Sequence, residues 1–317
     1  MEPELHVVFG AGQVGPRVAE ALLAAGHRVR IARRSAAPVP AGVALVRGDA
    51  LDPGFCAEAA RGAAAVYHCM NPPYSARVWA DVLPRFAENL VQAAGKADAR
   101  LVVLDNLYAL GRTHGRPMDE DTPIAPVSKK GEIRARVSVR LADAHRRGLA
   151  RVVAGRASDF YGPGGEGTYF GPQLWPAVLR GKPGLFPANP DTPHTYHFIP
   201  DVGRGLAALG TATADVEGQT FMLPCAPAES SRALLARMSA ALGREIRIRT
   251  LPSVVLRVLG LAVPIVREIS EMRYQWEEPF VVDDRRFRAR FPGVGPTDPD
   301  DGARATVAWA RARFGGT

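Results

Sequence analysis

The chain has 317 residues, of which 47% are hydrophobic and 23% are charged, a composition that excludes wholesale disorder. The length fits one large α/β unit, or a nucleotide-binding domain with a smaller lobe. The formal net charge is +8, but the basic residues stand singly or in pairs, so a nucleic-acid partner is not expected.

The three cysteines, Cys56, Cys69 and Cys225, are too widely spaced for a disulfide framework or a zinc site, and they suit a reduced interior. The start of the chain is acidic and unlike a signal peptide. The most apolar later stretch, residues 253–266, is shorter than the roughly 20 residues of a membrane helix and contains Arg257. We therefore expect a cytoplasmic protein with no membrane segment.

Short apolar runs alternate with longer Ala/Leu-rich segments over the first half of the chain. The runs predict strands at residues 5–9, 28–32, 43–47, 64–69, 101–105 and 151–154. The longer segments predict helices at residues 14–25, 78–94 and 133–147. Because the strands are apolar throughout rather than alternating, both faces of the sheet should be covered. The pattern predicts a doubly wound parallel Rossmann sheet, an α/β fold.

The second half is more irregular, with glycine and proline crowding residues 162–171 and 181–193. Helices are predicted at residues 231–242, 253–275 and 302–314, and strands near 220–223 and 246–250. We expect a dinucleotide-binding domain at residues 1–156 and a smaller C-terminal substrate lobe at 157–317, with segments around 195–223 returning to the Rossmann core. The lobe should cover the carboxyl ends of the strands, where ligands bind in open α/β sheets.

A glycine-rich turn, Gly10-Ala11-Gly12-Gln13-Val14-Gly15, follows the first predicted strand and begins the first helix. Gly10 allows a sharp turn, Gly12 lets a pyrophosphate approach the backbone, and Gly15 lets the helix pack closely on the sheet. The helix N-terminus then offers free N–H groups to the phosphates. This context predicts a dinucleotide site; the alternative is a structural turn that binds no ligand.

The end of the second predicted strand indicates which dinucleotide binds. An NAD site usually has an acidic residue there, whereas this chain has Arg33 and Arg34. Two guanidinium groups can hold a 2′-phosphate through charge-assisted bonds. NADP(H) is therefore the predicted cofactor, with NAD(H) possible and an ordinary basic loop as the alternative.

Several segments in order resemble the extended short-chain dehydrogenase/reductase family, in its NAD-dependent epimerase/dehydratase group. They are the glycine turn, Arg47-Gly48-Asp49-Ala50-Leu51-Asp52, Val66-Tyr67-His68-Cys69, the segment 156–164 containing Tyr161-Gly162-Pro163, the segment 197–204 containing Asp201-Val202, and the tail from Asp283. The resemblance implies that Asp49 contacts the adenine and that the loop at Asn71 lines the nicotinamide ribose. The full expected cofactor site is Gly10, Gly12, Gln13, Val14, Gly15, Arg33, Arg34, Asp49, Ala50, Cys69, Asn71, Arg134 and Tyr161.

The catalytic motif of that family is replaced in this chain. Asn106 stands where the family has Ser or Thr, Lys130 where it has the catalytic Tyr, and Arg134 where it has Lys. Arg134 can still hold the ribose hydroxyls. Asn106, Tyr108 and Lys130 are the predicted groups that handle the substrate oxygen, with Lys130 as the proton donor if burial or neighbouring cations lower its pKa. The alternative is that Lys130 is a solvated residue at a helix start.

No metal site is predicted, because His194 and His197 have no third ligand at suitable spacing. The sequence thus predicts an NADP(H)-dependent oxidoreductase or epimerase/dehydratase-like enzyme acting on a small organic carbonyl or alcohol. The alternative functions are an NADP(H)-binding redox sensor, or a protein that keeps the cofactor as structural support. A small-molecule substrate is the expected partner, and the resemblance also allows a homodimer.

Overall fold

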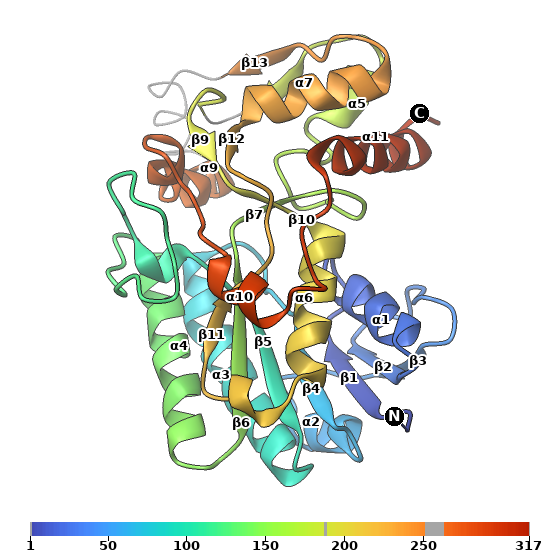
Figure 1. Cartoon of the computed structure of the whole chain (residues 1–317), viewed down its shortest axis with the longest axis vertical. Coiled ribbons are helices and arrows are strands. Elements are labelled where there is room, and N and C mark those ends of the chain that lie inside the picture. Colours follow the sequence, from blue (N-terminus) through green and yellow to red (C-terminus); the bar gives the residue numbers. More distant parts are fainter. Residues whose placement is uncertain (1, 187–188, 251–262, 317) are drawn as a thin grey trace.

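The structure is a computed structural model that describes residues 2–186, 189–250 and 263–316. A parallel sheet of seven strands, in the order β11-β6-β5-β4-β1-β2-β3, forms the centre of the larger part (Figure 1). Its strands are β1 (Leu5–Phe9), β2 (Arg28–Arg33), β3 (Ala44–Arg47), β4 (Ala65–His68), β5 (Arg100–Asn106), β6 (Arg151–Ala157) and β11 (Thr220–Met222). The predicted fold class, a doubly wound Rossmann sheet, is confirmed.

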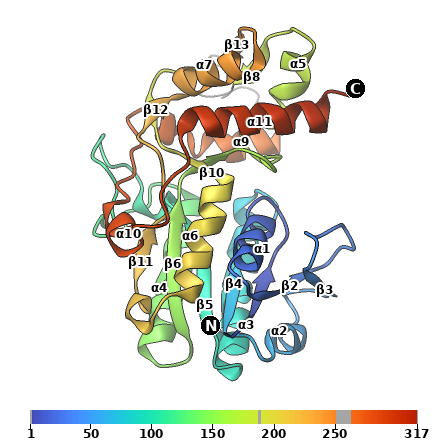
Figure 2. The same ribbon diagram turned by 45° about the vertical axis from the view of Figure 1, so that its right-hand side comes forward.

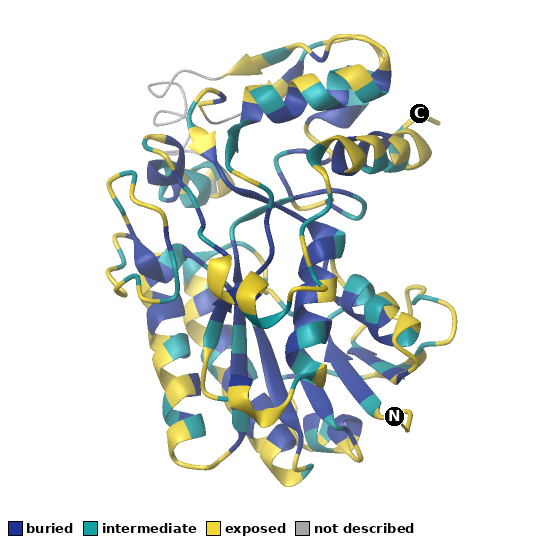
Figure 3. Cartoon of the chain, viewed as in Figure 1, coloured by how far each residue is buried: buried dark blue, intermediate teal, exposed yellow. Residues whose placement is uncertain are grey.

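Helices cover both faces of this sheet because its strands are apolar on both sides. The helices are α1 (Gly15–Ala24), α2 (Pro53–Ala60), α3 (Ala76–Lys96), α4 (Lys129–Arg146) and α6 (Ile199–Thr211). On β1, Val7 packs in the core formed with α2, α3 and α4, whereas the next residue, Val8, packs in the core formed with α1 and α6. Successive strand residues point to opposite faces, so a continuous apolar run fills two cores. Figure 3 shows the central strands of the sheet as mostly buried and the outer helix faces as exposed.

Most of the remaining elements form the smaller lobe, which is seen above the sheet in Figure 2. Its core contains Trp175, Phe186, Tyr196, Leu234 and Val307. The elements of the lobe are β7 (Asp159–Tyr161), α5 (Trp175–Leu179), β8 (Gly184–Phe186), β9 (Pro193–His194), β10 (Tyr196–Phe198), β12 (Glu229–Ser230), α7 (Ser231–Leu242), β13 (Ile248–Thr250), α9 (Pro264–Ser270) and α11 (Pro299–Phe314), with a short 3-10 turn at Arg273–Trp276. The helix α10 (Arg285–Arg290) lies beside β11, and its Phe287 packs in the core formed with α1 and α6. Further 3-10 turns follow β5, at Tyr108–Leu110, and α6, at Ala214–Val216.

The predicted helix at residues 253–275 falls partly on 251–262, which lie outside the described residues. Over residues 263–276 the structure has α9 and then a separate 3-10 turn, so this part is not one continuous helix. None of the helices that the structure describes is both long and apolar enough to cross a membrane.

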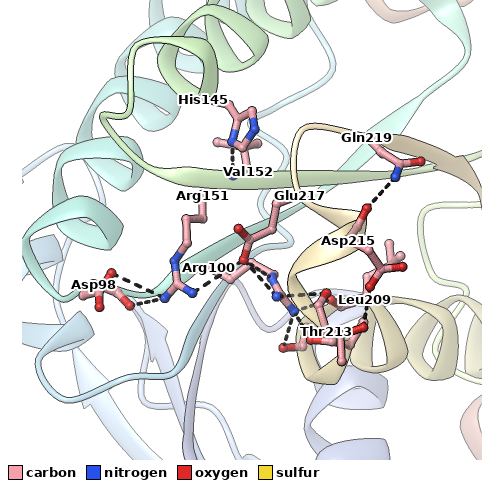
Figure 4. Close-up of polar contacts among 12 residues, drawn as sticks. Asp98, Arg100, His145, Arg151, Val152, Leu209, Thr213, Asp215, Glu217 and Gln219 are labelled. Atoms are coloured by element: carbon pink, nitrogen blue, oxygen red, sulfur yellow. Dashed lines mark hydrogen bonds and ion pairs between the residues drawn. The ribbon is translucent and has the colours of Figure 1, made fainter.

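The buried side chain of Arg100 fastens α6 to the sheet, as Figure 4 shows. Its Nη1 donates to the carbonyl oxygens of Leu209 (3.1 Å) and Ala212 (2.7 Å), and its Nη2 lies 2.9 Å from Glu217 Oε1. Carbonyl groups at the end of a helix have no partner within it. Arg100 supplies that partner, so the segment after residue 195 is held against β5.

Candidate functional site

A cavity of about 980 Å³ lies at the carboxyl ends of the strands, between the sheet and the smaller lobe. It reaches from the turn after β1 to residues that follow β5 and β6. The strand order reverses between β1 and β4. In open α/β sheets the crevice at such a reversal is where ligands bind. The volume is at the upper end of the range for ligand sites, about 300–1,000 Å³.

The glycine turn forms one wall of this cavity, and each glycine has a different reason to lack a side chain. Gly10 has φ +104°, and a Cβ there would lie 2.8 Å from the carbonyl oxygen of Cys69. A Cβ on Gly15 would lie 1.9 Å from the carbonyl oxygen of Gly10, so α1 packs closely on the turn. A Cβ on Gly12 would meet nothing within 4 Å, which leaves open space at the cavity wall.

The first turn of α1 is suited to an anion. It carries no acidic residue, and no side chain caps its N-terminus. The free N–H groups and the positive end of the helix dipole therefore face the cavity beside Gln13 and Val14, which both line it. The open space at Gly12 and this uncapped helix end fit the pyrophosphate of a dinucleotide.

Arg33, Arg34 and Asp49 line one end of the cavity, with Ala50 beside them. Asp49 Oδ1 accepts a hydrogen bond from the backbone N–H of Leu51 at 3.0 Å, which fixes the carboxyl group. Within the described residues, neither arginine side chain has a hydrogen-bond or ion-pair partner. Two positive charges are therefore available to a ligand at this end.

Arg134 of α4 lies at the middle of the cavity, where it is held by three groups. Its Nη2 donates to Asn71 Oδ1 at 2.9 Å, its Nη1 lies 3.7 Å from Asp105 Oδ1, and its guanidinium lies 4.8 Å from the centre of the Trp79 ring. Burial lowers the pKa of this guanidinium from its ordinary value, and the neighbouring Asp105 opposes that effect. Cys69 also lines the cavity here, and burial raises the pKa of its thiol to about 12.

Asn106 and Tyr108 line the end of the cavity opposite the arginine pair. Asn106 Oδ1 accepts from the backbone N–H of Tyr108 at 3.1 Å, so the Asn106 amide nitrogen is the atom that can donate to a ligand. The Tyr108 hydroxyl lies 3.3 Å from the hydroxyl of Tyr74, and its ring stacks on Trp79 at 6.1 Å. Burial raises the pKa of Tyr108 well above its ordinary value, with Tyr74 next in effect, so the phenol keeps its proton.

Lys130 does not line the cavity, contrary to the prediction that it meets the substrate. The residue is fully buried, and its ammonium donates to the carbonyl oxygen of Glu268 (3.1 Å), to the Glu268 carboxylate and to Glu271 Oε2 (2.9 Å). A lysine ammonium has three N–H donors, and these partners use all three. Lys130 thus ties the start of α4 to α9.

Tyr161 is also placed away from the cavity, although the sequence assigned it to the cofactor site. It is buried in the core of the smaller lobe, and a Cβ on Gly302 of α11 would lie 2.5 Å from its hydroxyl. Its position after β6 thus serves packing within the lobe. All other predicted cofactor residues except Gly15 line the cavity, namely Gly10, Gly12, Gln13, Val14, Arg33, Arg34, Asp49, Ala50, Cys69, Asn71 and Arg134.

Ser158 and Asp159 were not predicted as site residues, yet they follow β6 and line the cavity near Tyr108. Asp159 Oδ2 lies 2.9 Å from Nε2 of His194, a fully buried residue. The position of Asp159 just after a predicted strand of the parallel sheet is the sequence feature that could have identified it as a cavity residue. His194 could not be paired with it from spacing alone, because 35 residues separate them.

The ring nitrogens of His194 and His197 have protein partners rather than a common third ligand. His197 Nδ1 accepts from the backbone N–H of Ser158 at 3.1 Å, and its Nε2 lies 3.1 Å from the carbonyl oxygen of Leu223. A different group, Glu4, His6 and His27, has ligand atoms within 4.8 Å of one another, and none of the three lines the cavity.

Comparison with known proteins agrees with this arrangement. Residues 10–136 match a family described as NAD(P)H-binding. The chain matches no curated protein in sequence.

Solved structures show the same fold at low sequence identity. UDP-glucuronic acid 4-epimerase from Bacillus cereus in complex with NAD is 15% identical with a TM-score of 0.76, and 98% of this chain and 99% of that chain are covered. UDP-glucose 4-epimerase from Thermus thermophilus in complex with NAD is 20% identical with a TM-score of 0.75, at 98% and 99% coverage. A nucleoside-diphosphate-sugar epimerase from Pseudomonas aeruginosa is 18% identical with a TM-score of 0.74, at 98% coverage of both chains. These findings agree with the predicted resemblance in fold: residues 10–136 match an NAD(P)H-binding family, and the chain has the same fold as these epimerases.

Proposed function

We propose that this protein is an NADP(H)-dependent enzyme that oxidises or reduces a small organic alcohol or carbonyl, either as a net reaction or as a step of an epimerisation or dehydration. The observation that carries the proposal is one continuous cavity. The glycine turn before the uncapped helix α1 lines it, and so do Asn106, Tyr108 and Asp159. A dinucleotide laid along it places its reactive ring at the polar end. The bound cofactor supplies the hydride.

NADP(H) is proposed over NAD(H) because of the charge at the adenine end. Arg33 and Arg34 line the cavity there together with Asp49, whose carboxylate accepts a hydrogen bond from the backbone N–H of Leu51. A 2′-phosphate carries negative charge that two guanidinium groups can neutralise through charge-assisted hydrogen bonds. A bare 2′-hydroxyl gains little from that pair.

The substrate proposed for the other end carries little negative charge. The described residues that line this end include Asp159, Tyr74, Tyr108 and Tyr169. Apart from Arg33 and Arg34, the described arginine that lines the cavity is Arg134, which already contacts Asn71 and Asp105. The epimerases named above act on nucleotide sugars, whose phosphates need cations. The polarity of this end instead supports a neutral or cationic carbonyl or alcohol.

Asn106 and Tyr108 are proposed to hold the substrate oxygen. The Asn106 amide and the Tyr108 phenol are both hydrogen-bond donors in the cavity wall. Because burial keeps the Tyr108 proton tightly bound, its role is to polarise the carbonyl group rather than to give up the proton.

A second candidate function is an NADP(H)-binding sensor that does not turn its cofactor over. One observation favours it: Lys130, at the position of the family's catalytic Tyr, is buried in an ion pair away from the cavity. The two functions differ in whether NADPH is consumed. Loss of its absorbance with any member of a panel of carbonyl compounds supports the enzyme, and tight binding without consumption supports the sensor.

Calorimetric titration of NADPH and NADH into the wild type and Arg33→Ala tests the cofactor assignment. NADPH should bind more tightly to the wild type, and the variant should lose about tenfold or more of that affinity, the effect of about 1.5–3 kcal/mol for a hydrogen bond to a charged group. NADH affinity should change little.

Arg28→Ala is the matched control, because Arg28 is an exposed arginine at the opposite end of the same strand. It should leave both affinities unchanged. Tighter binding of NADH by the wild type, or an unchanged NADPH affinity in Arg33→Ala, would contradict the assignment.

A further inference from the structure

The buried imidazole of His194 lies between two oxygen atoms that both accept hydrogen bonds. Its Nδ1 lies 3.3 Å from the carbonyl oxygen of Gln275, and its Nε2 lies 2.9 Å from Asp159 Oδ2. The Trp276 and Phe280 rings stack on it at 5.0 and 5.1 Å, so the ring is fixed in this orientation. The residue is fully buried, whereas the Asp159 side chain is 21% exposed and lines the cavity.

This arrangement fixes the number of protons between the residues. A carbonyl oxygen can only accept, so Nδ1 of His194 carries a proton. A carboxylate oxygen also only accepts, so Nε2 must carry a second proton if Asp159 is ionised. A neutral ring would turn its Nε2 lone pair toward the carboxylate. The geometry therefore requires one proton between Nε2 and Oδ2, as in an imidazolium–carboxylate pair.

The other titratable groups around the pair do not take up or release protons near neutral pH. Burial lowers the pKa of His197 to about 4, so that ring is neutral. Burial raises the pKa of the surrounding phenols above their ordinary value, so they stay protonated; they are Tyr74, Tyr108, Tyr169, Tyr196 and Tyr274. The carboxylate of Glu271, at the end of α9, adds to the raised pKa of Tyr74 and of Tyr274 and is paired with Lys130.

We propose that Asp159 and His194 form the proton-transfer unit of this site. Asp159 exchanges a proton with the substrate oxygen, and His194, a positioning residue that does not line the cavity, holds that proton through its hydrogen bond to Asp159. The inference rests on the proposed oxidoreductase function and supplies the group that Lys130 does not provide. It also gives a reason for burying a histidine directly behind a cavity carboxylate.

In carbonyl reduction, the Asp159–His194 pair supplies the proton and NADPH supplies the hydride. The hydride of NADPH forms the new C–H bond, NADP⁺ is left, and the carbonyl π electrons move to oxygen. That oxygen takes one proton from the Asp159–His194 pair, which becomes a carboxylate and a neutral imidazole with its proton on Nδ1. The Ser158 hydroxyl, 3.4 Å from Nε2, can then donate to the exposed lone pair. A proton from water restores the pair, and alcohol oxidation runs the same steps in reverse.

The storage of the proton is tested without a substrate by ¹⁵N NMR of the full chain labelled in histidine, at pH 7.5. We expect His194 to show two protonated ring nitrogens, assigned by its absence in His194→Gln, and His197 to show one. In Asp159→Asn, an isosteric change whose amide can donate to Nε2, His194 should become singly protonated. Ser158→Ala should keep the doubly protonated form. A singly protonated His194 in the wild type overturns the proposal.

The transfer step is tested by single-turnover loss of NADPH absorbance with a carbonyl that the wild type reduces. Asp159→Asn should lower kcat/KM by about 10²–10³-fold, as for loss of a general acid, with a flattened pH profile and an NADPH Kd within about twofold of the wild type. An active wild type with an equally active Asp159→Asn overturns this inference alone. A wild type that consumes no NADPH overturns the proposed function and the transfer step with it, while the NMR result stands separately.

Discussion

Gly12 and Gly15 lie three residues apart in one turn, yet an added methyl group meets different surroundings at each. At Gly12 it would enter open cavity, and at Gly15 it would lie 1.9 Å from the carbonyl oxygen of Gly10. Gly12 does not adopt a left-handed φ, so alanine fits its backbone without strain. The first glycine leaves room for a ligand, and the second allows the fold.

Gly12→Ala should therefore lower NADPH affinity by about tenfold or more while changing the free energy of unfolding by about 0.5 kcal/mol at most. Gly15→Ala should lower the free energy of unfolding by about 1–3 kcal/mol, the range for overpacking. Calorimetry and urea denaturation measure the two effects. Unchanged NADPH affinity in Gly12→Ala would show that the phosphates do not lie against this turn.

Asn106 is predicted because it stands where the resembling family has Ser or Thr at the end of the fifth strand, and Tyr108 because it lies near the same edge of the sheet. Asp159 follows β6 at this edge. Its partner His194 is brought to it by the pairing of β10 with β7 and of β9 with β12, contacts between segments of the second half that no local pattern encodes.

At the level of elements, α6 is the longest of the described helices that the sequence did not predict; α2, α5 and α10 were not predicted either. The α6 glycines, Gly203, Gly205 and Gly210, are poor helix formers. In the structure they let the helix approach its neighbours: a Cβ on Gly203 would lie 2.6 Å from Arg17, and one on Gly210 would lie 1.9 Å from the Tyr67 hydroxyl. Close packing against α1 and the sheet thus outweighs the low helix propensity of these glycines.

The ion pairs of Lys130 join α4 of the sheet domain to α9 of the lobe, so Lys130→Met should act on stability. The change leaves the Glu268 and Glu271 carboxylates, which are 16% and 20% exposed, without their counter-charge. The free energy of unfolding should fall by about 3 kcal/mol, the lower end for breaking a buried ion pair, since both carboxylates still touch water. Urea denaturation measures this loss.

Lys129→Met is the control, because Lys129 is an exposed neighbour in the same helix turn. It should change the free energy of unfolding by no more than about 0.5 kcal/mol. If Lys130→Met abolishes turnover while leaving stability intact, Lys130 acts in catalysis as the sequence suggested.

For the whole molecule, three buried histidines predict a loss of stability in mild acid. Burial lowers the pKa of His6 to about 4, of His68 to about 3 and of His197 to about 4, with His27 adding to the effect on His6 and Arg134 to that on His68. In the unfolded chain a histidine has a pKa of about 6.5. At a pH between the folded and the unfolded pKa values, these three histidines bind protons in the unfolded chain but not in the folded chain.

The contribution of these neutral histidines to the free energy of unfolding is thus fully present above about pH 6.5 and is lost as the pH falls toward about 4. Near pH 5 the slope should approach about 4 kcal/mol per pH unit, from roughly 1.4 for each of three groups. Urea denaturation between pH 7.5 and 5 measures it. His114→Asn, at an exposed histidine, should keep the same slope. A free energy of unfolding that stays constant from pH 6.5 to 5 would contradict this account.

The sequence by itself determined the doubly wound sheet, the glycine turn and the arginine pair at the end of the second strand. Each of these depends on residues close together in the chain: apolar runs, glycines at fixed offsets, and side chains at a strand's end. Only the tertiary structure decided which charged side chains pair with one another where the lobe meets the sheet. There Lys130 meets Glu268 and Glu271, and Asp159 meets His194. These partners lie 35 to 141 residues apart, so their meeting depends on how the lobe packs on the sheet.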